Sequence, residues 1–166
     1  MYSPRAMDFA RLRFGDWVMG IGGLAVLLVM FLDWYGPPDE LLYVTEGLRW
    51  NAWEAFAVND VILAVAALLA IAAWVMTAVH PTAAVPLALA SLAGIVSILA
   101  LVLVMIRVIW PPDVFPDDVP LDTARETGAW LGLVATTVLT GGCLASIRDE
   151  RLPEPEHPVE PRLVEP

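Results

Sequence analysis

The sequence has a single cysteine, no lysine and no glutamine among its 166 residues. With Cys143 as the single thiol, the chain cannot form an internal disulfide, a CxxC redox pair or a thiolate metal cage. This excludes a thiol oxidoreductase of the kind that needs paired cysteines. We interpret Cys143 as a small packing residue beside Gly141 and Gly142.

Catalytic and ligand-binding motifs are also missing. The sequence has no HExxH zinc motif, no glycine-rich phosphate loop and no Ser-His-Asp pattern. His80 and His157 are placed where they cannot form a haem-binding pair across a bundle. The aspartates at 113, 117, 118 and 122 match no known cation-binding loop. We therefore expect no catalytic residue, no cofactor, no metal site and no enzymatic activity.

Charge is nearly absent from four long apolar stretches, Trp17–Leu32, Val61–Val79, Val85–Ile106 and Ala129–Ile147. Each is close to the ~20 residues that a helix needs to cross a bilayer. Strands of a membrane barrel are only ~10 residues long and alternate in polarity, which these stretches do not. The chain is 58% hydrophobic and its mean hydropathy is +0.69. The sequence predicts an all-α integral membrane protein with a four-helix bundle.

The predicted helices cover residues of about 17–34, 52–79, 83–109 and 127–147, in a transmembrane domain of residues 1–147. Asn51 and Glu54 have the spacing of a capping box at the start of the second helix. Bulky residues follow the first stretch where a signal-peptide cleavage site would need small ones, so we expect that helix to be retained. Residues 148–166, rich in proline and glutamate, are expected to be a disordered acidic tail.

The arginines predict the orientation. Six lie on the side of the termini and three, Arg49, Arg107 and Arg125, lie on the other side. The positive-inside rule places both termini in the cytoplasm and two acidic loops, 35–51 and 110–128, outside the cell membrane. The acidity of the chain, with a formal net charge of −10, argues against binding nucleic acid.

Few polar residues fall within the apolar stretches. Asp33, Asp60 and Arg107 lie at similar depth near the outer boundary, so we expect them to form one intramembrane ion cluster. The alternative is that Arg107 extends to the lipid headgroups. Small residues that allow close approach of helices are expected at helix-packing faces: Gly20, Gly23, Ala90, Gly94 and Ser97.

Tryptophans are expected to mark the membrane boundaries. Trp34, Trp53, Trp110 and Trp130 would lie near the outer interface and Trp17 near the inner one. Trp74 lies deeper in its stretch and is expected to pack between helices.

Three strings, Phe31-Leu-Asp-Trp-Tyr35, Trp50-Asn-Ala-Trp-Glu-Ala-Phe56 and Asn59-Asp60, resemble small four-helix membrane proteins of GC-rich, actinobacterial-type Gram-positive bacteria. The resemblance extends to Trp130 and to residues 146–150. That family has no assigned activity, so the resemblance implies only a fold and a bacterial cell-membrane location. The predicted topology is also similar to that of claudin-type proteins, whose paired loop cysteines are absent here.

Two classes of function are consistent with these features. One is a non-enzymatic membrane protein that binds or organises partner proteins, either other membrane proteins or further copies of itself in the lipid bilayer. The other is an oligomeric ion or small-solute transporter, or a channel subunit, with Asp33, Asp60 and Arg107 along a polar path. Because one subunit has so few intramembrane polar groups, we expect the first.

Overall fold

A computed structural model describes residues 9–38, 48–56, 58–79, 84–115 and 122–151. Within these residues the chain is mainly helical. The first element is a short 3-10 turn, η1 Phe9–Arg11. Five α-helices and three short strands follow in the order α1 Phe14–Val29, β1 Asp33–Gly36, β2 Trp50–Asn51, α2 Ala52–Ala55, α3 Asn59–Val79, α4 Ala84–Ile109, β3 Ala124–Arg125 and α5 Thr127–Arg151.

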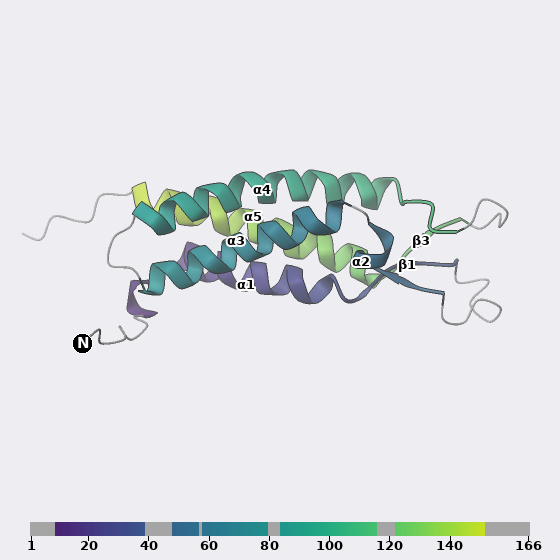
Figure 1. Cartoon of the computed structure of the whole chain (residues 1–166), viewed down its shortest axis with the longest axis horizontal. Helices are drawn as coiled ribbons and strands as arrows, with labels where there is room; N and C mark the ends of the chain where they lie inside the picture. The colour runs from purple at the N-terminus through teal and green to yellow at the C-terminus, as the bar shows by residue number, and fades with distance from the viewer. Residues whose placement is uncertain (1–8, 39–47, 57, 80–83, 116–121, 152–166) are drawn as a thin grey trace, which may run out of the picture.

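The long helices α1, α3, α4 and α5 lie side by side and run alternately in opposite directions (Figure 1). Each packs mainly against its two neighbours in a ring, α1 with α3, α3 with α4, α4 with α5 and α5 with α1. The α1–α5 interface is the most extensive. Among the described residues α3, α4 and α5 are long and apolar enough to cross a membrane, whereas α1 is an apolar helix of 16 residues.

Small side chains fill the interior of the bundle and large apolar ones cover its exterior. Alanines 66, 67, 70, 73, 93 and 100 are fully buried. Leu28 of α1, Leu68 of α3, Ile95 of α4 and Val134 of α5 are between 56% and 70% exposed. A soluble protein rarely leaves so much apolar surface uncovered, and helices in lipid use small residues to approach one another. The arrangement is that of a membrane protein.

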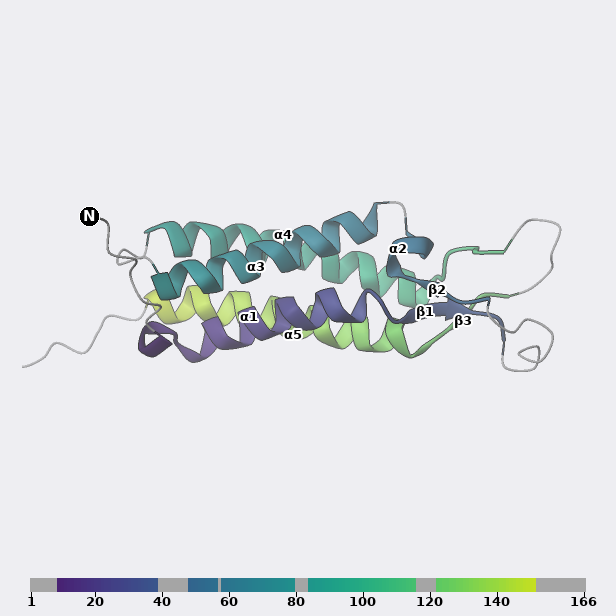
Figure 2. The same cartoon turned by 60° about the horizontal axis from the view of Figure 1, so that its bottom comes forward.

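The three strands form a small antiparallel sheet at one end of the bundle, in the order β2-β1-β3 (Figure 2). In the pairing of β1 with β3, Tyr35 lies opposite Arg125 and Gly36 opposite Ala124. The pairing of β1 with β2 contains an irregularity between Asp33 and Tyr35. We call this end of the molecule the sheet end, and the end with the start of α1 and the finish of α5 the far end.

The small sheet is an addition to the mainly helical fold that was predicted, and the structure corrects the end of the first predicted helix. α1 stops at Val29, five residues earlier than predicted, and a turn follows in which Phe31 N–H donates to Leu28 O and Leu32 N–H to Val29 O. The indole N–H of Trp34 donates to Val29 O at 2.9 Å. Trp34 therefore folds back onto the end of α1 instead of continuing it.

The second predicted helix is divided in two. Asn51 and Glu54 form the predicted capping box, with N–H to side-chain oxygen distances of 3.1 Å in both directions. The helix that they start, α2, ends after one turn because Phe56 has an extended backbone and its side chain is buried. α3 then begins at Asn59.

The other two helices match their predicted ranges more closely. α4 begins one residue after the predicted 83 and ends at the predicted 109, and α5 begins at the predicted 127. α5 continues to Arg151, so the first four residues of the predicted tail are helical. The rest of that tail, from residue 152, and residues 39–47 and 116–121 of the predicted loops lie outside the described residues.

Candidate functional site at the sheet end

The central strand, β1, is anchored in the bundle by two aromatic side chains. Trp34 is 1% exposed and Tyr35 is fully buried. The ring of Trp34 lies so close to α5 that a Cβ added at Gly132 would be 2.3 Å from it. Phe56 meets both rings edge to face, at centroid distances of 5.5 Å to Trp34 and 5.7 Å to Tyr35. The sheet is therefore in direct side-chain contact with the helices.

Tyr35 also ties the sheet to α4. Its hydroxyl donates a hydrogen bond to Arg107 O at 3.1 Å. Burial disfavours the phenolate and raises the pKa of Tyr35 to about 12, although the nearby cations of Arg107 and Arg125 act in the opposite direction. Tyr35 is therefore a neutral hydrogen-bond donor at physiological pH.

Arg125 of β3 holds the end of the same helix. Its Nε–H donates to Val108 O and its Nη2–H to Ile109 O, the latter at 2.8 Å. The last carbonyls of an α-helix lack partners within the helix and carry a partial negative charge. Arg125, held on the adjacent strand, supplies both N–H donors for these carbonyls and a positive charge. Since Arg125 faces Tyr35 across the sheet, these two residues together clamp the end of α4.

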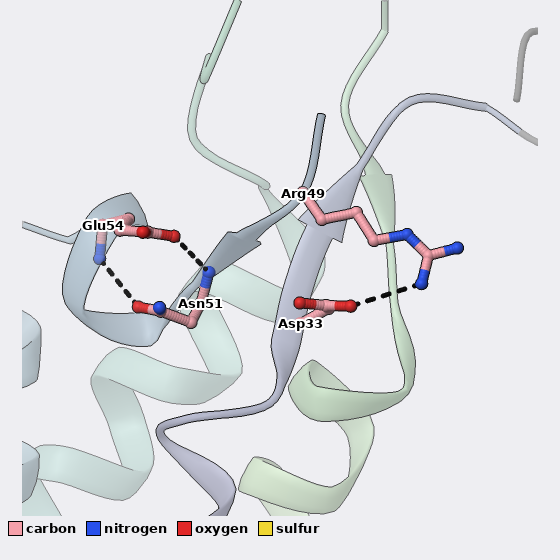
Figure 3. Close-up of polar contacts among 4 residues, drawn as sticks. All are labelled: Asp33, Arg49, Asn51 and Glu54. Carbon is pink, nitrogen blue, oxygen red and sulfur yellow. Dashed lines mark hydrogen bonds and ion pairs between the residues drawn. The ribbon is translucent and has the colours of Figure 1, made fainter. Parts of the chain in front are cut away.

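On the other side of β1, the segment before α2 is attached by hydrogen bonds and one ion pair. Ala52 N–H donates to Met30 O at 3.1 Å, just after the end of α1. Arg49 Nη1 lies 3.3 Å from Asp33 Oδ2, and both side chains are 47% exposed (Figure 3). An ion pair this exposed adds little stability, so its effect is mainly to orient the two side chains on the surface.

A shallow hollow of about 420 Å³ opens beside β2, lined by Leu48, Arg49, Trp50 and Glu54. We call it the β2 hollow. The indole of Trp50 packs edge to face on Phe115 at 5.1 Å, which brings the second predicted loop against the first. Trp53, 38% exposed, lies 6.1 Å from the ring of Phe31. The lining of the hollow thus combines the apolar side chains of Leu48 and Trp50 with charges of both signs, from Arg49 and Glu54.

The predicted ion cluster is not assembled among the described residues. Asp33 is on β1 and pairs with Arg49. Asp60 is buried and its Oδ1 accepts from Val61 N–H at 2.8 Å, within its own helix turn. The guanidinium of Arg107 lies over the ring of Phe56, 5.9 Å from its centroid. The early end of α1 explains the position of Asp33, which lies on a strand beside Arg49 and not on a helix.

The predicted packing residues all lie in the interior. Gly20 faces the ring of Trp74, and Gly23 faces Ala67 O. Ala90, Gly94 and Ser97 are buried on α4. Trp74 packs between helices as predicted, with its ring 5.4 Å from that of Trp17 in an edge-to-face contact. Trp34, predicted at the membrane interface, is instead part of the buried core.

Sequence reasoning missed the closest helix contacts. A Cβ at Gly15 would lie 2.4 Å from Ser146 N, and one at Gly142 would lie 2.4 Å from Met19 N. It also missed the role of Gly132, which makes room for Trp34. The small-xxx-small spacing of Gly128 and Gly132 was a signal that could have indicated that face of α5.

The described residues hold no group of three or more His, Cys, Asp or Glu side chains placed to bind a metal ion. Comparisons with protein-family models, curated proteins and solved structures found no match to this chain. The arguments for function therefore come from the geometry of the sheet end.

Proposed function

We propose that α1, α3, α4 and α5 all cross the cell membrane, with both termini in the cytoplasm and the sheet end outside. Three of these helices are long and apolar enough, and α1 lies between two of them with an apolar exterior that includes Ile21, Leu24 and Leu28. The arginine distribution, six against three, supports the orientation. A four-helix membrane domain with two outer loops follows from this arrangement.

This topology can be tested with a membrane-impermeant thiol reagent on intact cells. In a Cys143→Ala background, Asp113→Cys should be labelled and Ser3→Cys should be labelled only after the cells are permeabilised. Replacing the buried Cys143 leaves each introduced cysteine as the single thiol that the reagent can label. Labelling of Ser3→Cys but not of Asp113→Cys in intact cells would reverse the orientation.

Within that topology, we propose that the protein is a non-enzymatic membrane protein that binds partner proteins through the outer face of its sheet. The observation that carries the proposal is the anchoring of the sheet to three helices. Trp34 and Tyr35 of β1 anchor it by buried side chains, and Arg125 of β3 anchors it by hydrogen bonds to the end of α4. A surface held this firmly loses little conformational entropy on binding. The β2 hollow presents tryptophan and arginine, which are enriched at the centres of protein interfaces.

The buried polar side chains support binding over transport. Ser97 Oγ donates to Gly94 O, Thr136 Oγ1 to Gly132 O, and Thr140 Oγ1 to Ser97 O and Thr136 O. These hydroxyls meet helix carbonyls over distances of 2.7 to 3.2 Å. A solute path through one bundle would need polar groups directed at the solute, and these are directed at the backbone.

Site-specific photocrosslinking in native membranes tests the binding proposal. A photoreactive amino acid at Leu48, in the β2 hollow, should give a discrete crosslinked protein band, whereas one at the exposed Ile98 of α4 should not. Trp50→Ala, combined with the probe at Leu48, should weaken that band while the protein still melts at a similar temperature. If Leu48 and Ile98 give the same products, or Leu48 gives none, the sheet is not the binding surface.

A further inference from the structure

An apolar groove of about 660 Å³ lies between α4 and α5 near the sheet end. Met105, Val108 and Ile109 line it from α4, and Trp130 and Leu133 line it from α5. Thr137 lines it as well, but its hydroxyl donates to Leu133 O at 2.8 Å and is satisfied within its own helix. The groove is thus apolar along its length, and its volume lies within the ~300–1,000 Å³ typical of small-molecule sites.

A cation stands at one end of the groove. Arg125 is exposed, lines the groove, and uses two of its five N–H groups on Val108 O and Ile109 O. Among the described residues, no carboxylate oxygen lies within 4.0 Å of the Arg125 guanidinium. The ion pair found in this part of the chain joins Arg49 to Asp33 instead. The adjacent carboxylate, Glu126, lies beside Gly36 of β1. In a chain of net charge −10, this position offers an anion a positively charged contact.

The groove is short enough to lie within one leaflet of a membrane. From Trp130 to Thr137 the helix rises by about 10 Å, at 1.5 Å per residue. Half of the hydrocarbon thickness of a bilayer is about 15 Å. Trp130 is 54% exposed, and amphipathic indole rings favour the membrane interface. With α4 and α5 crossing the membrane, Arg125 lies at the headgroup level and Thr137 lies about 10 Å below Trp130, still within the outer leaflet.

We infer that this groove is a binding site for an anionic glycerophospholipid of the outer leaflet. One acyl chain lies along Met105, Leu133 and Thr137, and the phosphate accepts hydrogen bonds from the remaining N–H groups of Arg125. Charge-assisted contacts between arginine and phosphate are among the stronger hydrogen bonds in proteins. The bound lipid would stabilise α4 against α5 where Arg125 already holds the end of α4. This inference rests on the membrane topology proposed above and is independent of partner binding at the sheet.

Thermal unfolding of the purified full chain in detergent tests the site. Phosphatidylglycerol should raise the melting temperature by about 3–6 °C more than phosphatidylcholine with the same acyl chains, since a ligand that binds the folded state stabilises it. Thr137→Trp, which fills the groove, should abolish this difference. Val134→Trp is the matched control, because Val134 is 59% exposed on the same helix and does not line the groove, and it should leave the difference unchanged.

Arg125 requires two variants, because it also caps α4. Arg125→Lys should keep part of the preference for phosphatidylglycerol, and Arg125→Gln should lose it. Equal responses of the wild type to both lipids, or a preference that survives Thr137→Trp, would overturn the inference. The inference would also be overturned if Thr137→Trp changed the oligomeric state and left the response to phosphatidylglycerol unchanged. The groove would then be a contact between copies of the chain. Flotation of the wild type with vesicles of either lipid separately tests the membrane topology.

Discussion

The helix α5 approaches α1 more closely than it approaches α4 at the glycines of these two interfaces. Against α1, glycines bring backbone to backbone: a Cβ at Gly142 would be 2.4 Å from Met19 N and one at Gly22 would be 2.8 Å from Leu139 Cα. Against α4, a Cβ at Gly94 would be 3.5 Å from Ile147 Cδ1 and 3.7 Å from Cys143 Cβ, which is ordinary contact between side chains. Backbone cannot move aside as the end of a side chain can. A methyl group added at Gly142 or Gly22 would therefore overlap a neighbouring backbone at the α1–α5 interface, whereas one added at Gly94 would fit at the α4–α5 interface.

The polar contacts differ between these interfaces too. At the far end, Ser146 Oγ donates to Asp16 Oδ1 at 2.5 Å, and both residues are buried. Asp16 also accepts from Arg13 N–H at the start of α1, while Arg13 Nη1–H donates to Asp149 O. Between α4 and α5 the corresponding contact is a neutral hydrogen bond, from Thr140 Oγ1 to Ser97 O at 3.2 Å. The sheet, through Tyr35 and Arg125, adds three hydrogen bonds to the backbone at the end of α4.

The largest difference is expected between two adjacent glycines. Gly142→Ala should destabilise the protein by about 2–3 kcal/mol, because its methyl group would overlap the backbone of α1. Gly141→Ala is the matched control: nothing lies within 4 Å of its Cβ position, and alanine favours the helix by up to about 1 kcal/mol. Thermal melting in detergent measures both. Equal effects of the two substitutions would show that α1 and α5 are not in backbone contact.

A smaller effect is expected from the polar pair at the far end. In a double-mutant cycle, Asp16→Ala and Ser146→Ala should show a coupling of about 1–2 kcal/mol, as for a short buried hydrogen bond between side chains. The same cycle on the exposed pair Asp33 and Arg49 should give about 0.5 kcal/mol or less. A stronger coupling for the exposed pair than for the buried one would contradict this account of the α1–α5 interface.

Tyr35→Phe tests how the sheet holds α4. Loss of the hydrogen bond to Arg107 O should cost about 1 kcal/mol. The substitution should also change the pH dependence of stability. Because the folded-state pKa of Tyr35 is raised to about 12 from an ordinary value of 10.0, the unfolded chain loses this proton first and stability falls as the pH rises from about 10 to 12. Melting temperatures across that range should fall less in Tyr35→Phe than in the wild type.

The smallest effect is expected at Gly94. Gly94→Ala places a methyl group at ordinary contact distance from side chains and improves helix propensity, so stability should change by about 0.5 kcal/mol or less. Gly94→Leu should destabilise clearly, since its larger side chain cannot fit between α4 and α5. If Gly94→Ala were as damaging as Gly142→Ala, the two interfaces would be equally close.

Several features could be predicted from the sequence because their causes are local. The apolar stretches mark the long helices, and the ends of α4 and the start of α5 are at or within one residue of the predicted positions. The spacing of Asn51 and Glu54 predicts a capping box that the structure contains. Each depends on side chains within one turn, or on a run of similar residues, and neither requires knowledge of distant segments.

The tertiary structure alone decided the sheet and the residues that anchor it. β1 pairs with β3 across some 90 residues of sequence, so no local pattern indicates that Tyr35 meets Arg125 or that Trp34 fills the space above Gly132. Gly141 and Gly142 are the same residue in the same helix, yet one faces open space and the other the backbone of α1. A helix turns by 100° per residue, and only the position of a neighbouring helix determines which of two adjacent glycines must remain a glycine.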